Sequence, residues 1–142
     1  MDGYEYEQKC ADLLRAKGFS NITVTQGSGD QGIDVIAYKS GVKYGVQCKY
    51  YTGTVGNKAV QEAYAGAAYY GCAIAMVITN SVLSKSASTL AKELNVEIWE
   101  HIDAIYLLEH SKLETTDYTS LTQAEREDLQ LKEIEAYLQE KY

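Results

Sequence analysis

Residues 27–49 read GSGDQGIDVIAYKSGVKYGVQCK, and this stretch decides how the chain folds. Two runs that suit β-strands lie on either side of the pair Ser40-Gly41. A two-residue turn at that pair joins antiparallel strands and makes Lys39 the partner of Val42. The sequence therefore predicts a β-hairpin whose register is set by its turn.

The hairpin places three polar side chains on one face. The same register sets Asp34 directly opposite Gln47, and Lys49 returns to their face because alternate residues of a strand share one side of the sheet. Magnesium prefers oxygen ligands and often needs only one or two carboxylates from the protein. A lysine beside a metal-bound water aligns the nucleophile and offsets charge in the transition state. With the backbone carbonyl of Cys48 as a further oxygen, the pattern points to metal-dependent phosphodiester chemistry.

The glycine-rich segment GSGDQG at residues 27–32 also fits the G-x-G-x-x-G pattern of dinucleotide-binding proteins. That pattern requires a helix to begin among the glycines and an acidic residue about 20 positions later. Here a strand follows, and the corresponding later window lacks acids. We therefore interpret the glycines as an open turn that leaves Asp30 and Asp34 accessible to a bulky substrate.

Length and composition indicate one ordinary domain. The chain has 142 residues, enough for a substantial core but too few for two domains of typical size. No apolar stretch approaches the roughly 18 residues of a membrane span, and the N-terminus MDGYEYEQK is too polar for a signal peptide. We expect a cytoplasmic protein with no membrane association.

The three cysteines, Cys10, Cys48 and Cys72, are odd in number and lack the paired spacing of a zinc knuckle. A disulfide framework and a structural zinc site are therefore not expected. We interpret all three as small buried side chains.

The net charge of −7 argues at first against a nucleic-acid partner, because phosphate binding usually requires a basic surface. Much of this charge lies in the tail, since residues 111–142 carry a net charge of −4. Between Asp34 and Glu62 there is no acidic residue. The lysines of this window make the hairpin region locally basic, and they are Lys39, Lys43, Lys49 and Lys58.

Hydrophobic spacing predicts the elements around the hairpin. Helices are expected over residues 4–17, 57–70 and 84–94, with a helical stretch at 101–110 as well, and strands over 21–25, 33–38, 43–50, 73–79 and 96–99. Asn57 is the expected cap of the second helix, and Val60, Tyr64 and Ala67 or Ala68 form its expected inner stripe. The nearly all-apolar strand 73–79 should be buried on both faces.

The order α-β-β-β-α-β-α-β predicts an α/β fold with a mixed sheet. The first three strands should be antiparallel, and the last strands should be reached through helical crossovers. Helices should cover both faces of the sheet.

The C-terminal segment is expected to be an addition to this domain. Residues 111–121 form a polar joint, and Thr122 with Glu125 makes a capping box that opens a helix to about residue 140. Its one modest apolar stripe suits either a helix that folds back on the domain or one that binds a partner or a second copy.

Several motifs taken together resemble the catalytic domain of Mrr-type restriction endonucleases, in the PD-(D/E)xK nuclease superfamily. They are a first helix with Tyr6-Glu7, then GSGDQGIDVIA, VQCKYY, VGNKAVQEAYAGAAYYG, AIAMVITNS and VEIWE. The resemblance implies a restriction-endonuclease-like catalytic domain over residues 1–110, with 111–142 as an acidic helical extension.

The resemblance also implies site residues and an activity. In the family, the aspartate of GxD binds the metal, a glutamine replaces the usual acid of the E-x-K half-motif, and the lysine is catalytic. These positions are Asp34, Gln47 and Lys49, and the first-helix acid is Glu7, which holds the metal directly or through water. The implied activity is a magnesium-dependent endodeoxyribonuclease in which manganese substitutes.

Contacts to DNA are expected from the same region. Asp30 and Gln61 match recurrent polar positions of the family, and Tyr50 and Tyr51 follow the lysine along the substrate groove. The full expected set is Ser28, Asp30, Lys39, Lys43, Tyr50, Tyr51, Lys58 and Gln61. Restriction, repair and processing of mobile elements are all open as biological roles. Two alternatives also stay open, a non-cleaving DNA-binding module and a protein-interaction subunit that acts through its acidic tail helix.

Overall fold

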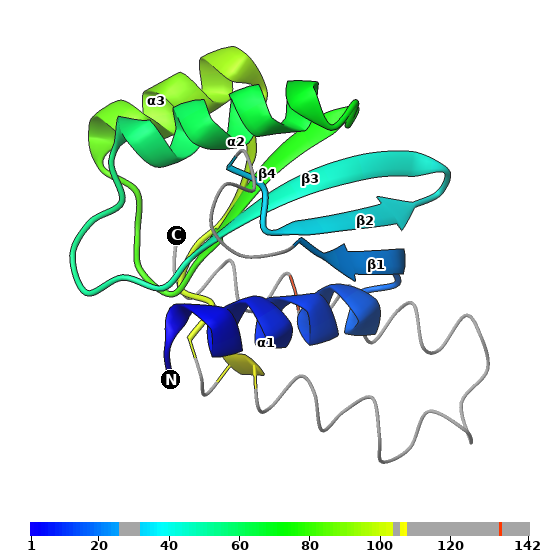
Figure 1. Ribbon diagram of the computed structural model, residues 1–142. Coiled ribbons are helices and arrows are strands. Elements are labelled where there is room, and N and C mark those ends of the chain that lie inside the picture. Colours follow the sequence, from blue (N-terminus) through cyan, green and yellow to red (C-terminus); the bar gives the residue numbers. More distant parts are fainter. Residues whose placement is uncertain (26–31, 104–105, 108–133, 135–142) are drawn as a thin grey trace.

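The computed structural model describes residues 1–25, 32–103, 106–107 and 134, and its elements follow the predicted order (Figure 1). They are α1 (Gly3–Ala16), β1 (Ser20–Val24), β2 (Val35–Lys39), β3 (Val42–Lys49), α2 (Asn57–Tyr69), β4 (Ile74–Thr79), α3 (Lys85–Leu94) and β5 (Glu97–Trp99). The strands form one sheet in the order β1-β2-β3-β4-β5. The first three strands are antiparallel, whereas β4 and β5 run parallel to β3. The predicted mixed sheet is confirmed.

The central hairpin has the register that its turn predicts. Lys39 pairs with Val42, and the same pairing continues to Val35 opposite Val46. Ser40 and Gly41 have φ angles of 53° and 77°, as a two-residue hairpin turn requires. The strand β2 begins at Val35, so the polar segment that precedes it enters the sheet at one end of the hairpin.

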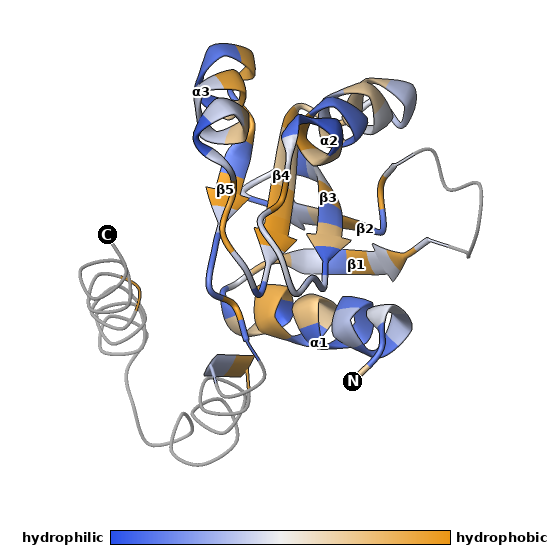
Figure 2. Ribbon diagram, turned by 90° about the vertical axis from the view of Figure 1, so that its left-hand side faces the viewer, coloured by the Kyte–Doolittle hydropathy of each residue, from blue (hydrophilic) through white to orange (hydrophobic). Residues whose placement is uncertain are grey.

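Helices cover both faces of the sheet. Helix α1 packs on β1, β2 and β3 and closes one core, which contains Leu14, Val35 and Ile78. Helices α2 and α3 lie on the opposite face and close a second core around Val60 and Val77. Figure 2 shows β4 as a strongly hydrophobic strand between these layers, and five of its six residues are buried. Burial of this strand on both faces is as predicted.

Helix α1 forms where its apolar spacing predicts. The Asp2 side chain caps it by accepting a 2.8 Å hydrogen bond from the backbone N–H of Glu5. The buried face consists of Tyr6, Cys10, Ala11, Leu13, Leu14 and Ala16. The chain leaves the helix at Gly18, whose φ of 91° is in the region that favours glycine.

Helix α2 differs from the prediction in two details. Its cap is Gly56, which makes no side-chain bond, and Asn57 is the first helical residue. The Tyr64 side chain is 50% exposed instead of buried. The inner face is made by smaller residues, namely Ala59, Val60, Ala63, Gly66 and Ala67. A helix lined by small residues can approach the sheet closely, and a tyrosine would have no room there.

Helix α2 approaches β3 closely at Gly45, in the middle of the strand. A Cβ atom at this position would lie 3.0 Å from the Cys72 sulfur and 3.4 Å from the Cα of Ala67. Helix α2 therefore rests on the backbone of β3, which brings its first turns near the end of that strand.

The expected C-terminal extension lies outside the described residues, apart from Ile134. This residue lines an apolar pocket that also contains Trp99 and Ile102. The helix expected at residues 101–110 is wrong for residues 101–103, which are not helical, and right for residues 106–107. The other residues of that stretch lie outside the described part. The two-part division of the chain and a role of the tail in dimer or partner binding stay predictions. None of the helices in the described ranges is long and apolar enough to cross a membrane.

Candidate active site

A polar pocket of about 490 Å³ lies at the end of the hairpin where β3 finishes. Residues from both helical layers reach it, because Glu7 comes from α1 and Glu62 comes from α2. Its full lining is Glu7, Gly32, Asp34, Gln47, Cys48, Lys49, Glu62 and Ala65. The four residues expected to be catalytic therefore meet in one pocket, although they come from separate parts of the chain.

Asp34 is held at the open end of the hairpin, opposite the turn, by hydrogen bonds to β3. Its backbone N–H donates to the carbonyl of Val46 at 2.8 Å, which extends the pairing beyond β2 by one residue. Its Oδ2 accepts a hydrogen bond from the backbone N–H of Cys48 at 2.8 Å. A charged acceptor makes such a bond shorter and stronger than a neutral one. The carboxylate is therefore fixed against β3, at the residue that lies between Gln47 and Lys49 in the sequence.

Gln47 is buried, with 4% of its surface exposed, and only one of the two polar atoms of its side-chain amide has a hydrogen-bond partner among the described residues. Its Nε2 donates a 2.8 Å hydrogen bond to Oε2 of Glu62. Its Oε1 makes no hydrogen bond with any described residue. A buried polar atom without a partner costs about 1–3 kcal/mol, so an amide oxygen in this state is suited to holding a ligand.

A divalent cation fits this oxygen and its surroundings. Carboxylate, amide and backbone carbonyl oxygens are the donors that Mg²⁺ accepts. Within the described ranges, no three His, Cys, Asp or Glu side chains group closely enough to hold a metal by themselves. A cation at this pocket would therefore rely on the mixed set of Asp34, Gln47 and the Cys48 carbonyl that the sequence predicts.

The thiol of Cys48 has a structural role, unlike its carbonyl. Its side chain is buried on the opposite face of the sheet, in the core closed by α1. A hydrogen bond with the Cys10 thiol and burial raise the pKa of Cys48 well above its usual range. The thiol is consequently neutral and serves as a small core side chain, as predicted for Cys10 and Cys48. Cys72 is only partly buried.

Lys49 is the last residue of β3 and links two pockets. Its carbonyl accepts a 2.7 Å hydrogen bond from the hydroxyl of buried Thr79 at the end of β4. Lys49 lines the polar pocket and also a smaller one of about 220 Å³ beside the start of α2. Lys58, Tyr51 and Glu62 are among the residues lining this second pocket.

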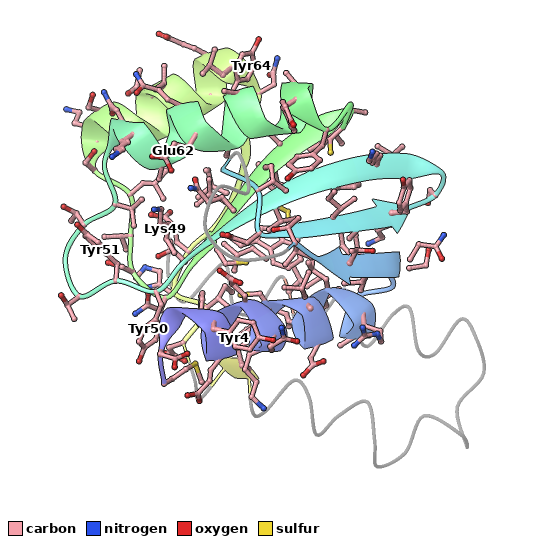
Figure 3. The ribbon with its side chains drawn as sticks, in the orientation of Figure 1. Tyr4, Lys49, Tyr50, Tyr51, Glu62 and Tyr64 are labelled. Atoms are coloured by element: carbon pink, nitrogen blue, oxygen red, sulfur yellow. The ribbon has the colours of Figure 1, made fainter. Side chains whose placement is uncertain are left out.

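The loop after β3 carries exposed aromatic rings next to the site (Figure 3). Tyr50 and Tyr51 are 42% and 52% exposed. Asn80 holds this loop, since its side chain accepts from the backbone N–H of Tyr51 at 2.7 Å and donates to the same residue's carbonyl at 2.9 Å. The ring of Tyr50 lies 5.2 Å from that of Tyr6. Tyr51 lines the smaller pocket, whereas Tyr50 packs against Tyr6 and lines neither pocket.

Other expected DNA contacts lie elsewhere. Lys39 stacks on Phe19 with 5.1 Å from its Nζ to the ring centroid, and the Nζ of Lys43 donates to the Tyr70 carbonyl at 2.6 Å. Both lysines are near the turn, about five residues or roughly 17 Å along the strand from the polar pocket. Ser28 and Asp30 lie outside the described residues.

Glu62 is a pocket residue that the sequence did not predict, since Gln61 is the expected contact on the same helix. Gln61 is exposed and does not line the pocket. The helical spacing contained the signal, because Glu62 follows buried Ala59 by three positions and precedes buried Gly66 by four. Residues three and four apart share a face, so Glu62 borders the inner stripe of α2.

Solved structures share this fold. A protein of unknown function, AF1548, aligns with a TM-score of 0.60 at 22% identity, over 83% of this chain and 72% of its own length. The DNA modification-dependent restriction endonuclease AspBHI aligns with a TM-score of 0.58 at 17% identity. That alignment covers 96% of this chain and 36% of AspBHI, so the chain corresponds to about a third of that enzyme. The fold is therefore the restriction-endonuclease-like α/β fold.

Family comparison is more specific. The model of the Mrr catalytic domain, described as a restriction endonuclease, matches residues 1–108. The chain belongs to this restriction endonuclease family, which confirms the resemblance found in the sequence. None of the curated proteins matches the chain.

Proposed function

We propose that this protein is a magnesium-dependent endodeoxyribonuclease that hydrolyses phosphodiester bonds. Membership of a restriction endonuclease family supports nuclease activity. The buried amide oxygen of Gln47, without a partner among the described residues, is the observation that carries the metal dependence. Manganese, which also takes oxygen ligands, should replace magnesium. DNA restriction, repair and mobile-element processing are roles that such an activity would serve.

The proposed ligands are the Asp34 carboxylate, the Gln47 amide oxygen and the Cys48 carbonyl. Glu7 lines the same pocket from α1 and would hold a water of the coordination shell or bind directly. The bound cation would supply a more acidic water and neutralise charge on the scissile phosphate.

Lys49 would contribute the protein's own cation beside the scissile phosphate. Its hydrogen-bonded backbone fixes the end of β3, so the ammonium group projects from a rigid position. There it would orient the attacking water and stabilise the extra negative charge of the pentacovalent transition state. The expected product carries a 5′-phosphate.

The DNA backbone is proposed to pass from the polar pocket into the smaller pocket beside α2. Lys49 and Lys58 provide positive charge there, and the side chain of Lys58 is 89% exposed. The first turn of α2 contains no acidic residue, so its positive dipole end is not neutralised. Tyr51 offers an exposed ring on which a base could stack.

A plasmid nicking assay tests the proposal. Wild-type protein, Asp34→Ala and Lys49→Ala are incubated with supercoiled plasmid and Mg²⁺ or Mn²⁺, with a chelator as the negative control. Nicking by the wild type alone is expected. Equal activity of all three proteins would refute the assignment of the site. Metal-independent DNA binding without nicking would instead support the non-cleaving alternative.

A further inference from the structure

The Gln47–Glu62 pair joins β3 to α2 inside the polar pocket. The Nε2 of Gln47 donates to Oε2 of Glu62 at 2.8 Å, and Gln47 is almost completely buried. An amide can present either its oxygen or its nitrogen to a neighbour. A carboxylate only accepts, so Glu62 selects the orientation in which the nitrogen faces it and the oxygen is turned away.

We infer that Glu62 is a positioning residue for the metal site, and this inference rests on the proposed function. By binding Nε2, it leaves Oε1 of Gln47 as the atom available to a cation. Without Glu62 the amide would be free to rotate and present nitrogen, which does not bind a hard cation. Outer partners of metal ligands act in this way when they fix ligand orientation.

The same contact explains why position 47 carries an amide. A glutamate there would place a second carboxyl group about 2.8 Å from that of Glu62. Two carboxyl groups at that distance do not both ionise easily, because their negative charges repel. In the pair as it stands, Gln47 provides the neutral ligand oxygen and Glu62 provides the negative charge. The charge at the pocket is retained although the strand residue is neutral.

Two further neighbours lie against Glu62, Gly32 at its backbone and Lys58 at its carboxylate. Gly32, with a φ of 81°, packs so closely that a Cβ atom would lie 2.6 Å from the Glu62 carbonyl. Lys58 lies one helical turn earlier, and its Nζ is 3.8 Å from Oε1 of Glu62. Lys58 and Gln47 therefore approach different oxygens of one carboxylate, and Gln47 makes the hydrogen bond.

Metal binding without DNA tests this inference. Calorimetric titration with Mn²⁺ is carried out on the 142-residue wild-type chain and on its Glu62→Gln and Glu62→Ala variants. The glutamine introduced by the first variant can still accept from Gln47 through its amide oxygen, whereas the alanine of the second has no acceptor. We expect Glu62→Ala to weaken Mn²⁺ binding by about 10- to 100-fold, and Glu62→Gln to retain most of the affinity. Thermal melting of each metal-free variant checks that the fold is intact.

An exchange of the two residues provides a second test. Gln47→Glu alone should bind Mn²⁺ more weakly than the wild type, because its carboxylate faces Glu62. In the double variant Gln47→Glu with Glu62→Gln, the hydrogen bond is restored with the donor and acceptor reversed. The double variant should regain Mn²⁺ affinity close to that of the wild type.

Specific results would overturn the positioning role. Equal losses in Glu62→Gln and Glu62→Ala would show that Glu62 acts through its charge or binds the metal itself. Unchanged affinity in Glu62→Ala would show that the contact is irrelevant to the metal. Failure of the wild type to bind Mn²⁺ would instead reject the metal site of the proposed function, together with any role of Glu62 in it.

Discussion

The Asp34 carboxylate accepts a 2.8 Å hydrogen bond from the backbone N–H of Cys48. This contact joins the two halves of the candidate site, because Cys48 lies between Gln47 and Lys49 on β3. The aspartate before β2 and the polar residues at the end of β3 are therefore held in register by backbone geometry. Substitutions that keep this hydrogen bond should separate the chemistry of the site from its folding.

Asp34→Asn is the substitution that meets this requirement. The amide oxygen of the introduced asparagine can still accept from Cys48, while the negative charge that would attract a cation is lost. We expect nicking to fall by roughly 100-fold or more, with little change in melting temperature. Asp12→Asn is the matched control, because Asp12 is exposed on α1 and pairs with Arg15 at the surface. A similar loss of activity in both variants would argue against a specific role of Asp34.

Lys49→Ala should affect turnover more than metal affinity. The proposed role of the ammonium group is to assist attack and stabilise charge, whereas the cation is held by oxygen atoms. We expect kcat to fall by about 10²- to 10⁴-fold while Mn²⁺ affinity stays near that of the wild type. Lys92→Ala, at an exposed position in the last turn of α3, removes the same charge at the end of that helix away from Val55 and the smaller pocket. A large loss of Mn²⁺ affinity in Lys49→Ala would contradict this division of roles.

Lys58→Ala tests the path proposed for DNA. Fluorescence anisotropy with labelled duplex, Ca²⁺ in place of Mg²⁺, and salt from about 50 to 200 mM gives the salt dependence of binding. Loss of one phosphate contact should reduce the slope of log K against log salt by about 0.9. Lys92→Ala, in the last turn of α3, should leave the slope unchanged. An unaltered slope in Lys58→Ala would place the DNA away from the start of α2.

Gly32→Ala tests how firmly α2 is packed against the turn before Asp34. The added Cβ would lie 2.6 Å from the Glu62 carbonyl, and the φ of 81° disfavours any residue with a Cβ. We expect a loss of about 1–3 kcal/mol in the free energy of unfolding, measured with urea. Gly3→Ala is the control, since a Cβ there meets no atom within 4 Å. Equal stability of the two variants would show that α2 can move away from Gly32 at little cost.

The sequence was sufficient for the hairpin and the order of elements, because both follow from local patterns. The turn pair Ser40-Gly41 determines the register, and hydrophobic spacing identifies the helices. Tyr64 could not be assigned in the same way, although the helical spacing of α2 does place Glu62 beside the inner stripe. The exposure of Tyr64 depends on how closely α2 packs on β3, which is a tertiary property determined by Gly45 and the small residues of the helix.

The family resemblance identified the site residues but did not explain each of them. It brought Asp34, Gln47, Lys49 and Glu7 together because those positions match motifs. It gave no reason for the glutamine at position 47. The reason lies in Glu62, on a different element, and this pairing is visible only when the two are seen in space.

Thiol labelling provides a final prediction that depends on pH. Burial raises the pKa of Cys72, and Lys43 lowers it in part, whereas the pKa of Cys48 is raised further by the Cys10 thiol and by full burial. Because a raised pKa leaves less thiolate at a given pH, alkylation with iodoacetamide should be slow at about pH 8 and accelerate as the pH increases. Partly buried Cys72 should react first, and Cys48 only on unfolding. Mass spectrometry of the labelled peptides measures the order, and rapid labelling of Cys48 in the folded protein would contradict the buried thiol pair behind the site.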